Sequence, residues 1–169
     1  LVDNNIRIAD PYTEKVLNPW NDQAIINLGV YPNLRPYPMG KTEEPVSVFQ
    51  TNQTPFTWVY SDTFNRPEQH KLIIYELLVR DFIANHDYAT LVDTLDYLQN
   101  LGINAVELMP VNEFEGNLSW GYNPSFYFAP DKYYGPAEDL KRFIDECHRH
   151  GIAVIQDIVL NHAYGQCPL

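Results

Sequence analysis

The second half of the chain alternates between short apolar runs and longer segments with a helical pattern of apolar positions. Strands are predicted at 72–77 and 105–108, and a third in the strand-like run that begins at Ile152 and leads to His162. The last of these runs is continuous enough for a strand buried on both faces. Apolar residues recur every three or four positions over 90–101 and 137–150, which predicts two helices packed on the strands. Gly102 and Gly151 follow these helices, as expected of residues that end a helix.

Local signals refine this pattern. Thr90 and Asp93 resemble a capping box for the first helix. Pro136 fits the first turn of the second helix, where a missing backbone N–H is tolerated. A long loop is predicted from 109 to about 135. Its two neighbouring carboxylates, Glu113 and Glu115, are expected to be solvated rather than to form an acid–base pair.

Residues 1–70 differ in composition from the second half, because they hold most of the 13 prolines. Proline blocks helix interiors, so extended chain with short strands at 6–8 and 46–48 is predicted. This region is too poor in apolar residues to fold alone, and we expect it to pack on the second region or on a preceding domain. Leu1–Asn5 is not a signal peptide, and the chain lacks an initial Met, so a piece of a longer protein is expected.

Composition narrows the class of protein. Hydrophobic residues make up 45% of the 169 residues and charged residues 20%, which is typical of a globular chain. The formal net charge of −11 argues against nucleic acid or an anionic membrane as a partner. Cys147 continues an apolar helical stripe and is expected to be a buried thiol, whereas Cys167 falls in a loop. Two cysteines do not indicate whether the protein works in an oxidising or a reducing compartment.

The order strand, helix, strand, loop, helix, strand predicts an α/β fold with a parallel sheet. A doubly wound sheet and an eight-stranded barrel both satisfy this order. The chain has no G-x-G-x-x-G and no P-loop, which weakens the nucleotide-binding alternative. In a β/α barrel, polar residues just after a buried strand lie at the active-site face. Asp157, Asn161 and His162 occupy that position after the last run.

Five segments, in order, resemble the α-amylase superfamily, glycoside hydrolase family 13, on its branching-enzyme, isoamylase and pullulanase side. They are Asp10–Tyr12, Ile74–Phe82, Tyr97–Val111, Trp120–Pro130 and Asp157–His162. Leu78 stands where this family usually has His. The resemblance implies the N-terminal portion of a (β/α)8 TIM barrel, with its first three strands in residues 71–169. Residues 1–70 would then be a proline-rich linker from an upstream β-sandwich domain.

The resemblance also implies roles for individual residues. Tyr122 would stack on the sugar next to the scissile bond, His162 would hydrogen-bond that sugar, and Trp120 would contribute a further aromatic contact. Asp157 would hold an Arg near the nucleophile. Asn161 is a calcium ligand in many α-amylases, so the cofactor is expected to be either none or calcium. Without the resemblance, His162 would be read as a structural histidine and Asp157 as the cap of a strand.

The family's nucleophile and general acid lie on later strands, so no catalytic residue is expected within residues 1–169. The leading hypothesis is a fragment of a retaining glycoside hydrolase or transglycosylase acting on α-glucans such as starch, glycogen or maltooligosaccharides. Its partners would be the glucan and the rest of the catalytic chain, and the piece alone is expected to be inactive and poorly stable. The alternatives are a non-catalytic glucan-binding protein with a degenerate barrel and, more remotely, a doubly wound protein.

Overall fold

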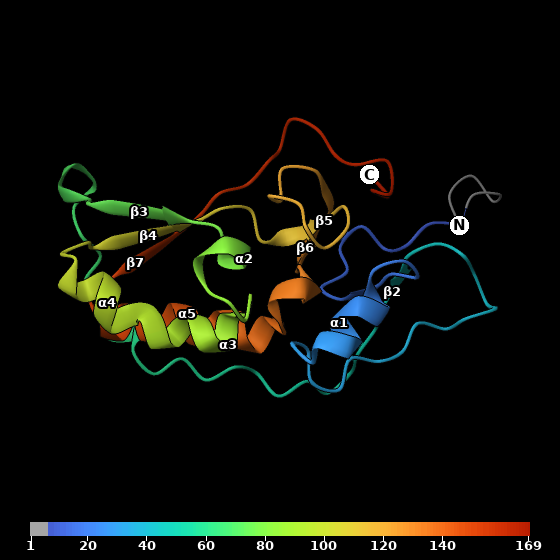
Figure 1. The fold of residues 1–169 in the computed structure, drawn as a ribbon, viewed down its shortest axis with the longest axis horizontal. Helices are drawn as coiled ribbons and strands as arrows, with labels where there is room; N and C mark the ends of the chain where they lie inside the picture. The colour runs from blue at the N-terminus through green and yellow to red at the C-terminus, as the bar shows by residue number, and fades with distance from the viewer. Residues whose placement is uncertain (1–6) are drawn as a thin grey trace.

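The computed structural model describes residues 7–169 and is centred on a parallel sheet (Figure 1). Its strands are β3 (Ile74–Leu77), β4 (Ala105–Leu108) and β7 (Ala153–Gln156), in the order β3-β4-β7. Both pairings are parallel, which confirms the predicted α/β arrangement. The last strand ends at Gln156 within the predicted run. The Asp157 N–H still donates to Leu108 O at 3.0 Å, and β4 ends at Leu108.

The register of the sheet separates two faces. Tyr75, Val106 and Val154 align across the three strands and pack into the main hydrophobic core. Glu76 and Glu107 align with each other on the opposite face, since successive side chains of a strand alternate. The helices α3, α4 and α5, which span residues 88–91, 95–100 and 137–149, lie together on one side of the sheet in Figure 1. Acidic residues therefore occupy the face that these helices leave uncovered.

The helices are α2 (Val79–Phe82), α3 (Tyr88–Leu91), η3 (Val92–Thr94), α4 (Leu95–Asn100) and α5 (Ala137–Arg149). The helix predicted at 90–101 is thus a run of three short pieces that begins earlier. The predicted cap was wrong, because the Asp87 carboxylate accepts Thr90 N–H at 2.6 Å and Thr90 O–H at 2.8 Å. The helix predicted at 137–150 is confirmed as α5. Its Cys147 is a fully buried free thiol, as expected.

The predicted loop from 109 to 135 contains regular structure. The strands β5 (Asn112–Phe114) and β6 (Pro124–Pro130) form an antiparallel pair, followed by η4 (Lys132–Tyr134). Register shifts on both sides of Glu113 interrupt the pairing. Such irregularities remove the strict two-residue alternation that identifies a strand from sequence. The hairpin stands between the parallel sheet and the N-terminal region in Figure 1.

The N-terminal region packs on the rest of the described chain. Its elements are β1 (Val16–Leu17), α1 (Asp22–Leu28), β2 (Val46–Ser47), η1 (Ser61–Thr63) and η2 (Gln69–Lys71). The strand predicted at 46–48 is confirmed as β2, paired with β1. The one predicted at 6–8 is not formed at 7 and 8, and Ile6 lies outside the described residues. Helix α1 was not predicted, yet its Ile25 belongs to the main core.

A carboxylate on α5 fastens the segment around η1 to the helix. Asp145 accepts the backbone N–H groups of Val59, Tyr60 and Ser61 at 2.9–3.1 Å, together with the Ser61 hydroxyl at 3.0 Å. Burial alone would raise the pKa of Asp145, but these donors stabilise its charged form and hold the pKa below the usual value. We call residues 58–64 with their attachment to Asp145 the Asp145 clip.

Across the described residues, no helix combines the length and the apolar character that crossing a bilayer requires.

Candidate functional site

The loop between β5 and β6 returns to the carboxyl end of β4 at Gly121. Gly121 has φ +91°, and a Cβ at this position would lie 2.3 Å from the carbonyl oxygen of Pro110. The backbone therefore approaches the chain beyond β4 as closely as only glycine allows. This contact places the next residue, Tyr122, above the end of the sheet.

We expect Gly121→Ala to destabilise the folded chain by about 3 kcal/mol, because it combines an unfavourable positive φ with an overlap against backbone. The matched control is Gly116→Ala in the same loop. Gly116 also has positive φ, but its added Cβ would meet no atom within 4 Å. Chemical denaturation of both variants measures the difference. Equal losses would show that the approach to Pro110 imposes no constraint.

Tyr122 and Asp157 are joined by a direct hydrogen bond. The Tyr122 hydroxyl donates to Asp157 Oδ2 at 2.8 Å. This bond, with partial burial and the nearby carboxylates of Glu76 and Glu107, raises the pKa of Tyr122 to about 12. The phenol thus stays protonated at neutral pH and remains a donor. The bond fixes the orientation of both side chains at the end of β7.

His162 completes the cluster from the segment that follows β7. Its Nε2 lies 2.8 Å from the carbonyl oxygen of Tyr122 and 3.3 Å from Asn123 Oδ1. A carbonyl oxygen can only accept, so Nε2 carries a proton and Nδ1 is left for other partners. The Tyr127 hydroxyl donates to His162 O at 2.8 Å and holds the segment from the other side. The ring is exposed and accessible to a ligand.

Polar side chains brace the loop that carries Tyr122. Glu115 Oε1 accepts from Ser119 Oγ at 3.0 Å and from Asn123 Nδ2 at 2.8 Å. The second bond orients the Asn123 amide so that its oxygen faces His162. Arg80, at the start of α2, donates to the carbonyl oxygen of Leu118 and pairs with Asp81. The loop is therefore tied both to itself and to the end of β3.

The structure brings together Tyr122, Asp157 and His162. The sequence predicted that residues following the strands would meet at one edge of the sheet. Trp120 lies in the same loop with 61% of its surface exposed. Asn161 is exposed beside His162. In residues 7–169, no group of three or more His, Cys, Asp or Glu side chains is arranged to hold a metal ion. A single exposed amide does not make a calcium site, so these residues do not fit the metal.

Sequence reasoning missed two carboxylates at this site. Glu76 and Glu107 are paired in register on the uncovered face of the sheet, and both contribute to the electrostatic environment of Tyr122. Glu76 is exposed and Glu107 half-buried. The two-residue alternation of β3 and β4 would have placed each of them on one face. Only the register between the strands shows that the two share that face with Asp157.

Glu113 was expected to be solvated, and this expectation was wrong. Only 5% of its surface is exposed, and Lys132 Nζ lies 2.5 Å from its Oε1. Lys132 is equally buried and lies 3.5 Å from Asp22 Oδ1 of α1. Burial raises the pKa of Glu113 and of the neighbouring Asp131, while Lys132 opposes both shifts. We call Asp22, Glu113, Asp131 and Lys132 the buried charge cluster. It joins α1 to the base of the hairpin.

Comparison with known proteins places this geometry in a family. Residues 58–167 match the alpha-amylase catalytic domain. Over 90 residues the chain is 44% identical to malto-oligosyltrehalose trehalohydrolase of Arthrobacter ramosus, covering 53% of this chain and 16% of that protein. Over 113 residues it is 35% identical to the 1,4-alpha-glucan branching enzyme of Oceanobacillus iheyensis, covering 62% and 17%.

The fold is shared with solved structures of this group. The pullulanase SAP of Group B Streptococcus aligns with a TM-score of 0.69 at 24% identity, over 94% of this chain and 24% of that one. This likeness covers the N-terminal region as well as the parallel sheet. The chain thus spans a minor part of the length of each of these three proteins. The family match over more than half of its residues shows that the chain belongs to the alpha-amylase family.

Proposed function

We propose that residues 71–169 form the first part of a (β/α)8 catalytic barrel, with β3, β4 and β7 as its first three strands. The parallel order β3-β4-β7 and the helices on one face support this arrangement. The opposite face, with Glu76 and Glu107, would line the barrel interior. Residues 1–70 would lead into the barrel from an upstream β-sandwich domain.

The activity that this site supports best is retaining cleavage or transfer of α-glucan chains. The observation that carries the proposal is the hydrogen-bonded cluster of Tyr122, Asp157 and His162 beyond the carboxyl ends of parallel strands. Glycoside cleavage passes through a transition state with positive charge on the sugar ring. The carboxylates of Asp157, Glu76 and Glu107 provide a negative field at the same edge, which stabilises such a charge.

Each residue of the cluster has a separate part in this proposal. The ring of Tyr122 offers an apolar face for one side of a sugar, and its hydroxyl is kept in place by Asp157. His162 presents its imidazole edge to a sugar hydroxyl. Asp157, held by Tyr122, would also pair with an arginine from a later strand. The nucleophile and the general acid would come from later strands, as in other members of the family.

Calcium has no part in this proposal. Calcium in proteins takes several oxygen ligands, whereas Asn161 offers one exposed amide oxygen. The residues around it lack the group of carboxylates that would complete a site within the described chain.

The test uses the complete enzyme, called the full chain below, in which residues 1–169 are joined to the later strands that would supply the nucleophile and the general acid. It is incubated with maltoheptaose and with a branched dextrin. We expect new products whose anomeric configuration is α when formed, as followed by proton NMR. Shorter chains would indicate hydrolysis, and longer or branched chains would indicate transfer. Binding of maltoheptaose without any product would support the alternative of a non-catalytic glucan-binding protein. Products formed first as the β-anomer would contradict a retaining mechanism.

A further inference from the structure

A groove of about 330 Å³ lies between the turn before β1 and the segment after β2. Exposed aromatic residues stand in both of its walls. Tyr12 has 70% of its surface exposed and Phe49 has 92%. Two large aromatic side chains are therefore exposed around one groove, where a ligand could contact both. The groove shares no lining residue with the cluster at Tyr122.

Hydrogen bonds hold the backbone that carries Tyr12 and Phe49, and the Tyr12 ring packs on a neighbouring aromatic ring. The ring centroid of Tyr12 lies 5.4 Å from that of Phe128 on β6. The Tyr12 N–H donates to Asp10 Oδ1 at 2.9 Å, which fixes the turn that carries it. Phe49 follows Val48, whose N–H donates to Lys15 O at 2.9 Å beyond the β1–β2 pair. The backbone on both sides of the groove is therefore fixed and the Tyr12 ring is packed, which lowers the entropic cost of binding a ligand.

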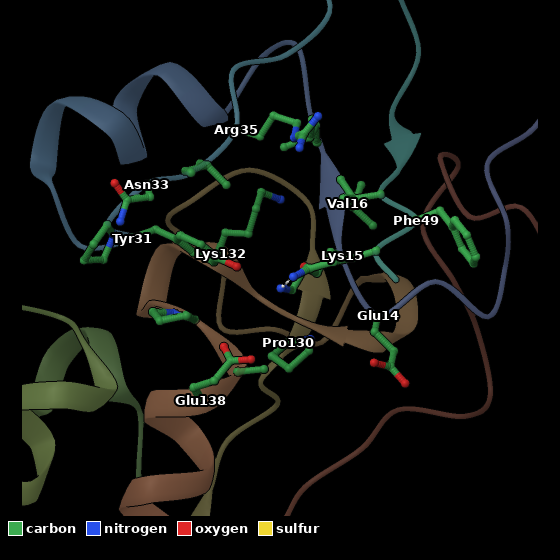
Figure 2. A pocket seen from close by; sticks show the side chains of 17 residues that line it. Glu14, Lys15, Val16, Tyr31, Asn33, Arg35, Phe49, Pro130, Lys132 and Glu138 are labelled. Carbon is green, nitrogen blue, oxygen red and sulfur yellow. Dashed lines mark hydrogen bonds between the residues drawn. The ribbon is translucent and has the colours of Figure 1, made fainter. Parts of the chain in front are cut away.

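Figure 2 shows the neighbouring cavity of about 430 Å³, which shares part of this wall. In that view Lys15 reaches toward the cavity, whereas the ring of Phe49 points away from it. Phe49 does not fill this cavity, and its ring remains on the exposed side of the β1–β2 pair. The ring is therefore available to a ligand in the groove.

The polar lining of the groove offers both donors and acceptors. Lys15 Nζ donates to Gln50 Oε1 at 2.9 Å, and Gln53 Nε2 donates to Gln50 O at 3.5 Å. Within the described residues, these contacts leave the Gln50 amide N–H groups and the Gln53 side-chain oxygen unused. Asp10 and Glu14 outnumber Lys15, so the groove has no excess of positive charge that would select phosphate. Amide groups beside aromatic faces suit the hydroxyls and apolar faces of a neutral sugar.

We propose that this groove is a second α-glucan site, separate from the site at Tyr122, with Tyr12 and Phe49 stacking on sugar rings. The glucan as ligand rests on the proposed function. Strand β6 links the two sites, because Phe128 supports Tyr12 while the hydroxyl of the adjacent Tyr127 holds His162. Successive side chains of a strand point to opposite faces, so the two sites open on different sides of the hairpin.

The separation of the two sites predicts which glucans bind more tightly because of the groove. A short oligosaccharide cannot fill both sites at once, whereas a glycogen particle presents many chain ends and can occupy both. Binding at the groove then raises the effective concentration of chain ends at the Tyr122 site. The groove therefore acts on affinity for polysaccharide and leaves the cleavage of short oligosaccharides unchanged.

The test uses the full chain and its Tyr12→Ala and Phe49→Ala variants. Native gels containing glycogen measure affinity for the polysaccharide, and kcat/KM is measured on maltotriose. We expect each variant to bind glycogen about fivefold to tenfold more weakly with unchanged maltotriose kinetics. Tyr97→Ala is the matched control, because Tyr97 on α4 is 56% exposed and lies outside the groove. Its affinity for glycogen should equal that of the unchanged protein.

Two results would overturn the proposal. One is unchanged glycogen affinity in both variants. The other is a lower melting temperature in both, which would show that Tyr12 and Phe49 contact another part of the full chain. Either result leaves the proposed function intact if maltooligosaccharides are still cleaved. Absence of cleavage or transfer in the unchanged protein would instead reject the proposed function. The native gels containing glycogen would still measure binding at the groove in that case.

Discussion

Replacing Lys132 by methionine should destabilise the folded chain by about 3–5 kcal/mol, the cost of breaking a buried ion pair by removing one partner. Lys132 is the cation of the buried charge cluster, and its Nζ lies 2.5 Å from Glu113 Oε1 and 3.5 Å from Asp22 Oδ1. Without it, these carboxylates remain buried with no opposite charge. Urea denaturation of the full chain measures the loss, and Lys41→Met at an exposed position is the control.

Two further measurements separate lost charge from lost packing. The double variant Glu113→Leu with Lys132→Met should recover part of the loss, because it removes both charges. Acidification should also help the single variant. Burial raises the pKa of Glu113 and of Asp22 in the folded state, so their penalty is present at neutral pH and disappears as the pH falls toward their unfolded values near 4. A loss independent of pH would mean that packing dominates.

Replacing Tyr122 by alanine should lower kcat/KM of the full chain on maltoheptaose by about 100-fold, the effect expected when a positioning contact at a reacting centre is lost. The change removes both the aromatic face and the hydrogen bond to Asp157 Oδ2. Tyr122→Phe keeps the face and removes only the hydrogen bond, so it should retain more activity than the alanine variant. Steady-state kinetics with melting temperatures for each variant give the comparison.

Tyr97→Ala again serves as the control, because Tyr97 is exposed on α4, which packs on the face of the sheet opposite the site. Its kinetics should match those of the unchanged protein. If Tyr122→Ala keeps full turnover while remaining folded, Tyr122 does not contact the substrate. If phenylalanine and alanine lower kcat/KM equally, the bond to Asp157 matters and stacking does not.

The sequence predicted the parallel sheet and its helices because these elements depend on local periodicity. β4 was predicted at its observed bounds, and α5 within one residue. The hairpin was missed because register shifts around Glu113 disturb its alternation. Helix α1 was missed because it has seven residues within a proline-rich region, and its stability comes from Ile25 in the core rather than from helical propensity.

The residues of the candidate site also fall into two groups, those that local sequence predicts and those that depend on tertiary contacts. Tyr122, Asp157 and His162 could be singled out because each lies in a motif with a fixed sequence. Glu76 and Glu107 could not, since their shared face depends on the register between two strands. The burial of Glu113 depends on Lys132, which lies 19 residues away across the hairpin, and on Asp22 of α1. Contacts of this kind are set by tertiary structure and leave no local pattern.

The Asp145 clip has a consequence for the order of folding. The carboxylate lies 84–86 residues after the backbone N–H groups that it accepts. During synthesis, residues 58–61 leave the ribosome long before α5 exists, and closing so long a loop is entropically slow. Residues 58–64 therefore remain solvent-exposed at first and pack on α5 only after the helix has formed. In pulsed hydrogen exchange, the amides of Val59, Tyr60 and Ser61 should gain protection after those in the core of α5.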